Sequence, residues 1–275
     1  SVLSGVNSTM MCYGMTGSGK SFTMLGSGGK KGALVGLVGL AAQDLFAKAD
    51  ASSGMVTIEV AFMQLYGTVA TDLLVDSPAP LKIARREGEI LVEGQSRRHV
   101  ATPNDVAAVV REGAARRKVA SQKLNSASSR SHAVLTFFIS SFEADENSEA
   151  SSNASGSDDD STAVARVTKL VCVDLAGSER VKESGVEGVA LREAQAINLS
   201  LFHLIRVVQI LNERSKITAR TALSRVPYAD SPLTLLLSDA LGGSCRTALI
   251  ATLSPAQEHA VRLLGSNLRV RPLRV

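Results

Sequence analysis

GMTGSGKS, residues Gly14 to Ser21, matches the pattern G-x-x-x-x-G-K-[S/T] at every fixed position. An apolar run of strand length, residues 9–13, comes directly before it, and residues 21–25 can begin a helix after it. A glycine-rich loop between a strand and the start of a helix is typical of a phosphate-binding loop. An accidental glycine-rich turn is the alternative, and the motifs farther along the chain argue against it.

Each part of this loop has a chemical reason for its position. Glycines let successive backbone N–H groups turn toward anionic oxygens, Lys20 adds a cation for the terminal phosphates, and Ser21 supplies a hydroxyl for Mg²⁺. We therefore expect the loop to bind a nucleotide together with Mg²⁺. The candidate nucleotide-binding residues of the loop are Gly14, Met15, Thr16, Gly17, Ser18, Gly19, Lys20 and Ser21.

The composition is that of one large globular domain, with 275 residues of which 45% are hydrophobic. No stretch resembles a membrane span, and residues 1–5 contain no initiator Met and no signal or transit peptide, so the sequence reads as if cut from a longer chain. Three cysteines, widely spaced, indicate free thiols in a reducing compartment.

Charge is unevenly distributed along the chain. Residues 141–161 contain seven acidic residues and no Lys or Arg, so the remainder has 30 basic against 19 acidic residues, a net charge of +11. We expect the Ser-rich acidic stretch, residues 141–163, to be a disordered loop between two strands. A basic body favours an anionic partner, which could be nucleic acid, an acidic membrane surface or an acidic protein. Aromatic residues are 4% and Trp is absent, which gives little support to base stacking.

Hydrophobic periodicity predicts alternating helices and strands. One strand, residues 167–174, ends in Asp174, and a carboxylate at that place in a chain with a phosphate-binding loop is expected to be a second Mg²⁺ partner. Helices are predicted at residues 34–45, 102–118, 188–212 and 231–241, and the other strands at residues 9–13, 55–66, 81–83, 90–92, 132–140 and 246–253.

Two groups of basic residues lie at helix ends. Arg111, Arg116, Arg117 and Lys118 lie toward the end of the helix at residues 102–118, where they indicate either a solvated helix end or a contact surface. A polar loop, residues 212–225, projects positive charge from one place on the surface. Its basic residues are Arg214, Lys216, Arg220 and Arg225.

Several longer motifs together resemble the kinesin motor domain, in the order and at the spacing found in that family. The resemblance covers residues 1–255, and SSRSH and DLAGSE are its most specific signatures. The motifs are CYGMTGSGKSFTM at residues 12–24, NSASSRSH at 125–132, VDLAGSER at 173–180, EAQAINLSL at 193–201, VPYADSPLT from 226 and DALGGSCRT ending at 247.

The resemblance implies a three-layer α/β/α P-loop NTPase fold with a central, mostly parallel sheet, and an ATPase with two switch segments. Ser129 would reach Mg²⁺ and help to hold the attacking water, and the Gly177 N–H would meet the γ-phosphate. Phe22 matches the position that stacks on adenine. The implied catalytic residues are Ser128, Ser129, Arg130, Gly177 and Glu179, with an Arg130–Glu179 ion pair closing the site, and the implied metal-binding residues are Ser21, Ser129 and Asp174.

The resemblance also implies microtubules as the partner, through residues 188–240, and a cytoplasmic location on the cytoskeleton, with neither nucleic-acid binding nor membrane insertion. Tubulin is acidic, which suits the basic body. Ala229 and Pro232 stand where the family usually has basic residues, so we expect weakened microtubule contact. A non-motile binding module, truncated or without activity, is therefore the alternative to a motor.

Two further departures concern the ends of the domain. Members of the family begin with a further strand and an R-x-R-P segment that this sequence lacks, so we expect a partial motor domain over residues 1–275. From about residue 257 the tail matches the family poorly. Its residues 269–273 read RVRPL, which has the R-x-R-P pattern of the segment that this sequence lacks at its start.

Overall fold

A computed structural model describes residues 2–27, 35–51, 55–123, 130–142, 165–179, 189–214 and 225–253 of the chain. Of the loop predicted at residues 141–163, residues 141 and 142 belong to a strand, and residues 143–163 lie outside these ranges. The tail from residue 257 and residues 125–129 of the NSASSRSH motif also lie outside them. No helix in the described ranges is both long and apolar enough to cross a membrane.

A single sheet forms the centre of the described structure, with strand order β5-β4-β3-β2-β7-β8-β1-β9 and β6 paired to β2. β1 pairs in parallel with β8 and β9, and the other pairs are antiparallel, so the sheet is mixed. The strands are β1 (Ser8–Tyr13), β2 (Met55–Tyr66), β3 (Val69–Asp72), β4 (Pro80–Arg86), β5 (Glu89–Glu93), β6 (Arg98–His99), β7 (His132–Phe142), β8 (Ala165–Asp174) and β9 (Arg246–Ala251).

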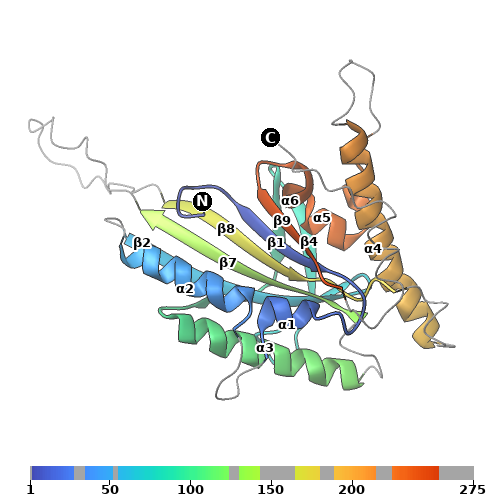
Figure 1. The fold of residues 1–275 in the computed structure, drawn as a ribbon, viewed down its shortest axis with the longest axis horizontal. Coiled ribbons are helices and arrows are strands. Elements are labelled where there is room, and N and C mark those ends of the chain that lie inside the picture. The colour runs from blue at the N-terminus through green and yellow to red at the C-terminus, as the bar shows by residue number, and fades with distance from the viewer. Residues whose placement is uncertain are drawn as a thin grey trace, which may run out of the picture.

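Helices cover both faces of this sheet, so the expected three-layer α/β/α architecture is confirmed. Figure 1 shows α1, α2 and α3 on one side and α4, α5 and α6 on the other. The helices are α1 (Lys20–Leu25), α2 (Leu37–Asp50), α3 (Pro103–Lys123), α4 (Val189–Arg214), α5 (Pro232–Leu236) and α6 (Ser238–Gly242), with a 3₁₀ turn η4 (Tyr228–Asp230) before α5.

Two apolar cores lie between these layers, because side chains along a strand alternate between its faces. In β1, Met11 and Tyr13 pack in the core beneath α4, α5 and α6, whereas Cys12 packs in the core beneath α2 and α3. The predicted long helix is present as α4, and its Leu201 and Leu204 are buried. The three cysteines are free, as expected.

Predicted and observed elements differ in several places. α2 begins three residues later and ends five residues later than predicted, and several strand ends shift by one to three residues. α3 continues to Lys123, five residues beyond the predicted end, because basic residues are compatible with a helix end without requiring one. The helix predicted from Ser231 is two short helices, since Leu237 leaves helical geometry with φ −92° and ψ 8°. β3 and β6 were not predicted, because these strands of four and two residues carry no extended apolar pattern.

Candidate functional site

The glycine-rich loop lies between β1 and α1, as the sequence predicts. Gly17 and Gly19 adopt φ of 79° and 97°, a backbone conformation that side-chain-bearing residues rarely take. An added Cβ would meet nothing within 4 Å at either position, so conformation and not crowding requires glycine there. The loop is therefore turned in the way that leaves room for a bound anion beside its backbone.

Lys20 is buried at this loop, with 6% of its surface exposed. Its Nζ donates a hydrogen bond to the Met15 carbonyl at 2.7 Å, so the ammonium group lies over the loop. Burial lowers the pKa of Lys20, and the nearby carboxylates of Asp174 and Glu179 oppose that shift. A phosphate would supply the charge partner that a buried ammonium needs.

Asp174 ends β8 directly beside the start of α1. Its Oδ2 accepts hydrogen bonds from Ser21 Oγ at 2.6 Å and from Arg117 Nη1 at 2.8 Å. Its Oδ1 is buried and has no hydrogen-bond partner in the described part of the chain. The sequence predicted this pairing of hydroxyl and carboxylate for Mg²⁺, and the structure brings the two groups together.

Arg117 is a site residue that the sequence prediction missed. It lies on α3 with its side chain 7% exposed, contacting Asp174 and donating to Ser131 at Oγ (3.1 Å) and at the carbonyl (2.6 Å). The sequence predicted that this basic group lies either at a solvated helix end or on a contact surface. Arg117 does neither, because it is buried. Consecutive arginines such as Arg116 and Arg117 point about 100° apart on a helix, so at most one can face the sheet. The helical periodicity of residues 116 and 117 was therefore the feature of the sequence that could have indicated a buried arginine.

The segment after β8 runs along the phosphate-binding loop. Leu175 and Ser178 donate their N–H groups to the carbonyls of Cys12 (3.3 Å) and Gly14 (3.1 Å). At Gly177 an added Cβ would lie closer than van der Waals contact to the Thr16 hydroxyl and to the Glu179 carboxylate, so a larger residue would displace these side chains from each other. DLAGSE and GMTGSGKS, far apart in sequence, therefore share one site.

Glu179 is bound to the phosphate-binding loop. Its Oε2 accepts from the Thr16 N–H at 2.9 Å and its Oε1 from the Thr16 hydroxyl at 2.5 Å. The Arg130–Glu179 ion pair stays a prediction. Ser128 and Ser129 lie outside the described residues, so the structure does not place them.

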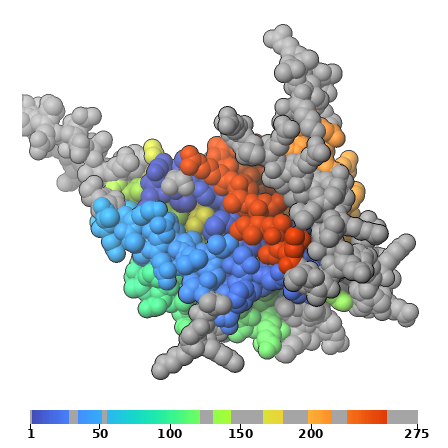
Figure 2. Space-filling model, in the orientation of Figure 1, coloured from blue at the N-terminus to red at the C-terminus, as the bar shows by residue number. Residues whose placement is uncertain are grey.

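Two residues flank the loop. Phe22 of α1 is half exposed, so its ring is accessible to a stacking partner. Thr252, which no sequence motif indicated, follows β9, and its Oγ1 lies 2.7 Å from Ser18 Oγ while its N–H donates to the Tyr13 carbonyl at 2.9 Å. Figure 2 shows the described N-terminal and C-terminal segments side by side on one face. Thr252 and Ser18, far apart in sequence, meet because β9 pairs with β1.

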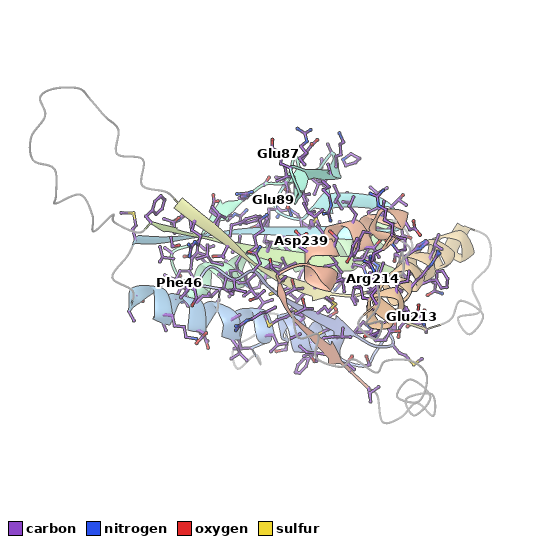
Figure 3. The ribbon with its side chains drawn as sticks, turned by 90° about the horizontal axis from the view of Figure 1, so that it is seen from above. Phe46, Glu87, Glu89, Glu213, Arg214 and Asp239 are labelled. Atoms are coloured by element: carbon purple, nitrogen blue, oxygen red, sulfur yellow. The ribbon has the colours of Figure 1, made fainter. Side chains whose placement is uncertain are left out.

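The predicted partner surface is described in part. Arg214 ends α4 and is exposed, as is Arg225, whereas Lys216 and Arg220 lie outside the described residues. Figure 3 shows Arg214 next to Glu213 at the end of α4. Arg206 on the same helix lies 3.6 Å from Asp230 of η4.

These residues fit a magnesium nucleotide. A buried ammonium group, an open glycine-rich turn, and a serine hydroxyl beside a carboxylate with an unpaired buried oxygen are the donor set that triphosphate and Mg²⁺ require.

Comparison with known proteins agrees with this geometry. Residues 1–265 match the model of the kinesin motor domain. The chain is 37% identical to the kinesin-like protein KIN-UC of Arabidopsis thaliana over 262 residues, covering 94% of this chain and 24% of that protein. It is 35% identical to the kinesin-like protein cut7 of Schizosaccharomyces pombe over 289 residues, covering 99% of this chain and 25% of that protein.

A solved structure is similar as well. It is the structure of a fast kinesin, described for its implications for ATPase mechanism and interactions with microtubules, with a TM-score of 0.78, 33% identity, and coverage of 92% of this chain and 66% of the other. The chain thus spans about a quarter of the length of KIN-UC and of cut7. Since the family model covers nearly the whole sequence, the chain belongs to the kinesin motor domain family.

Proposed function

We propose that this chain is a motor ATPase that hydrolyses ATP and uses the cycle to bind, release and move along microtubules. The observation that carries the proposal is the convergence of Lys20, Ser21, Asp174 and Gly177 at one loop. The family supports nucleotide use, and the fast kinesin with a similar fold is described for its ATPase mechanism.

Within this proposal the loop residues Gly14–Ser21 hold the phosphates and Phe22 stacks on the adenine. Ser21, Ser129 and Asp174 would hold Mg²⁺, which would supply positive charge beside the phosphates. Ser128 and Ser129 orient the attacking water, and the Gly177 N–H donates to the γ-phosphate.

In this proposal Glu179 also responds to the bound nucleotide. Its carboxylate occupies the Thr16 N–H, a donor of the phosphate-binding loop. A phosphate that takes over this donor would displace the Glu179 carboxylate from the loop, which is the behaviour expected of a switch segment.

The partner surface follows from charge. Arg214, Lys216, Arg220 and Arg225 form a basic group in the region of residues 188–240, and tubulin is acidic. Attraction of this kind is screened over about 8 Å at physiological ionic strength, so binding should weaken as salt is raised. Ala229 and Pro232 supply no positive charge, and we propose that they lower the affinity.

Steady-state ATP turnover, measured with and without microtubules, tests the proposal. Lys20→Ala should lower turnover by about 10²–10³-fold, because it removes a preorganised charge at the phosphates. Lys48→Ala, which removes an exposed lysine of α2, is the matched control and should keep the parent rate. Equal turnover in parent and Lys20→Ala, or microtubule binding that ignores nucleotide in a pelleting assay, would contradict a motor ATPase.

A further inference from the structure

A buried histidine joins three parts of the molecule that meet behind the nucleotide site. His132 is the first residue of β7 and is 1% exposed. Its Nδ1 accepts a hydrogen bond from the Ala176 N–H at 3.0 Å, and its Nε2 lies 2.9 Å from Ser200 Oγ on α4. One imidazole ring therefore links β7, the segment after β8, and the long helix α4.

The partners of this ring determine its protonation. The Ala176 N–H can only donate, so Nδ1 carries no proton, and in the neutral ring Nε2 must carry it and donate to Ser200 Oγ. Burial first, then the charges of Arg117 and Lys20, lowers the pKa of His132 to about 3. The ring is thus neutral, with one tautomer, throughout the physiological range.

The positions of Ala176 and Ser200 allow the His132 ring to transmit a movement from one to the other. Ala176 directly precedes Gly177, whose backbone lies against Thr16 of the phosphate-binding loop. Ser200 is buried in α4, and the same helix carries exposed Arg206 and Arg214. A shift of α4 along its axis would move Ser200, and the rigid ring would pass that displacement to the amide beside the γ-phosphate position.

We propose that His132 is a positioning residue that couples α4 to the segment Leu175–Glu179, so that a partner bound on α4 changes the rate of ATP turnover. The coupling deepens the proposed function and rests on it. His132 touches neither nucleotide nor Mg²⁺ in this proposal. It acts through the Ala176 amide.

The test removes only the helix side of the link. Ser200→Ala should leave basal ATP turnover within about twofold of the parent and lower the microtubule-stimulated rate about fivefold, the factor that corresponds to one ordinary hydrogen bond. Ser200→Thr keeps a hydroxyl and should restore stimulation. Thr168→Val removes a buried hydroxyl of β8 that donates to the Ile139 carbonyl of β7. It is the control and should behave like the parent.

A second measurement needs neither ATP nor microtubules. Amide hydrogen exchange at Ala176 should be about fivefold faster in Ser200→Ala than in the parent and in Thr168→Val, because the ring that holds this amide loses its anchor. Nitrogen chemical shifts of the His132 ring should report a proton on Nε2 in the parent.

The outcomes separate the two proposals. If microtubules fail to stimulate the parent, the proposed function is wrong, and the Ala176 exchange rate alone decides the coupling. If Ser200→Ala keeps both the parent's stimulation and the parent's exchange at Ala176, His132 is a core residue with no coupling role. A proton on Nδ1 would likewise overturn the assignment.

Discussion

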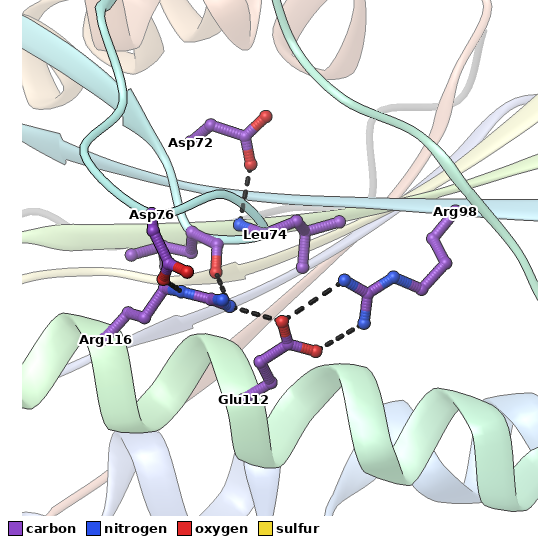
Figure 4. A network of polar contacts seen from close by, with 7 residues as sticks. Asp72, Leu74, Asp76, Arg98, Glu112 and Arg116 are labelled. Atoms are coloured by element: carbon purple, nitrogen blue, oxygen red, sulfur yellow. Dashed lines mark hydrogen bonds and ion pairs between the residues drawn. The ribbon is translucent and has the colours of Figure 1, made fainter.

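Arg116 and Arg117 are neighbours on α3 and lie in opposite environments. Arg116 belongs to a network at the surface, where it contacts Asp76 at 2.9 Å and Glu112 at 2.5 Å, and Arg98 contacts the same Glu112 (Figure 4). Arg117 is buried against Asp174 at the nucleotide site. Two residues of the same type, one peptide apart, therefore serve a surface network and a candidate active site.

The comparison teaches that burial decides what a charge contributes. In the surface network water screens each pair, and the loss of one partner leaves a charge that can be rehydrated. At Asp174 the removal of Arg117 takes the guanidinium partner away from a carboxylate that is 1% exposed, with the Ser21 hydroxyl and the nearby Lys20 still beside it. The buried pair should therefore respond far more strongly to substitution than the exposed network.

Arg117→Ala should produce the largest effect. The free energy of unfolding should fall by about 3–5 kcal/mol, because a buried charge loses its partner. Urea denaturation followed by circular dichroism measures this, with Arg111→Ala, an exposed arginine of the same helix, as control. If the two variants have the same midpoint, burial does not distinguish the two environments.

The buried region should also have its own pH dependence, through His132. Its pKa of about 3 lies below the ordinary value of 6.5, so the unfolded state takes up a proton first and the folded state loses stability as pH falls below 6.5. The slope has an upper limit of about 1.4 kcal/mol per pH unit. His132→Asn should lack this component, and parallel stability curves for parent and variant between pH 6.5 and 4.5 would contradict the assignment.

Glu112→Gln tests the surface network by pH. Hydrogen bonds first from Arg98 and then from Arg116 lower the pKa of Glu112 from 4.5 to about 2. The stabilisation is present above pH 4.5 and is lost as pH falls toward 2. We expect Glu112→Gln to lower the free energy of unfolding by about 1–2 kcal/mol at neutral pH, after reduction by solvent screening, and most of this deficit to be lost by pH 2. A deficit of the same size at pH 2 and at neutral pH would show that packing, not charge, stabilises this network.

The smallest effect should come from an isolated exposed pair. Lys48 and Asp44 lie 2.6 Å apart on α2, with both side chains more than 60% exposed. Lys48→Ala should lower the free energy of unfolding by no more than about 0.5 kcal/mol. A loss above 1 kcal/mol in thermal or urea unfolding would mean that the exposure of a charged pair does not determine how much it contributes to stability.

Local patterns were sufficient to predict most of the fold and the centre of the site. The β2 and α2 predictions rest on periodicity, and the structure contains both elements. The placement of Ser21 beside Asp174 followed from a loop and a strand end, each recognisable in a few consecutive residues. Such features are visible in sequence because neighbouring residues alone produce them.

Contacts between distant segments depended on the tertiary structure. Periodicity did not reveal that Arg117 faces Asp174, that Thr252 contacts Ser18, or that His132 joins Ala176 to Ser200. Each contact requires the relative placement of elements that separate parts of the chain supply. The sequence by itself determined the loop, the elements and the family motifs, whereas packing of the layers decided which charged and polar side chains meet, because burial and distance are properties of the assembled fold.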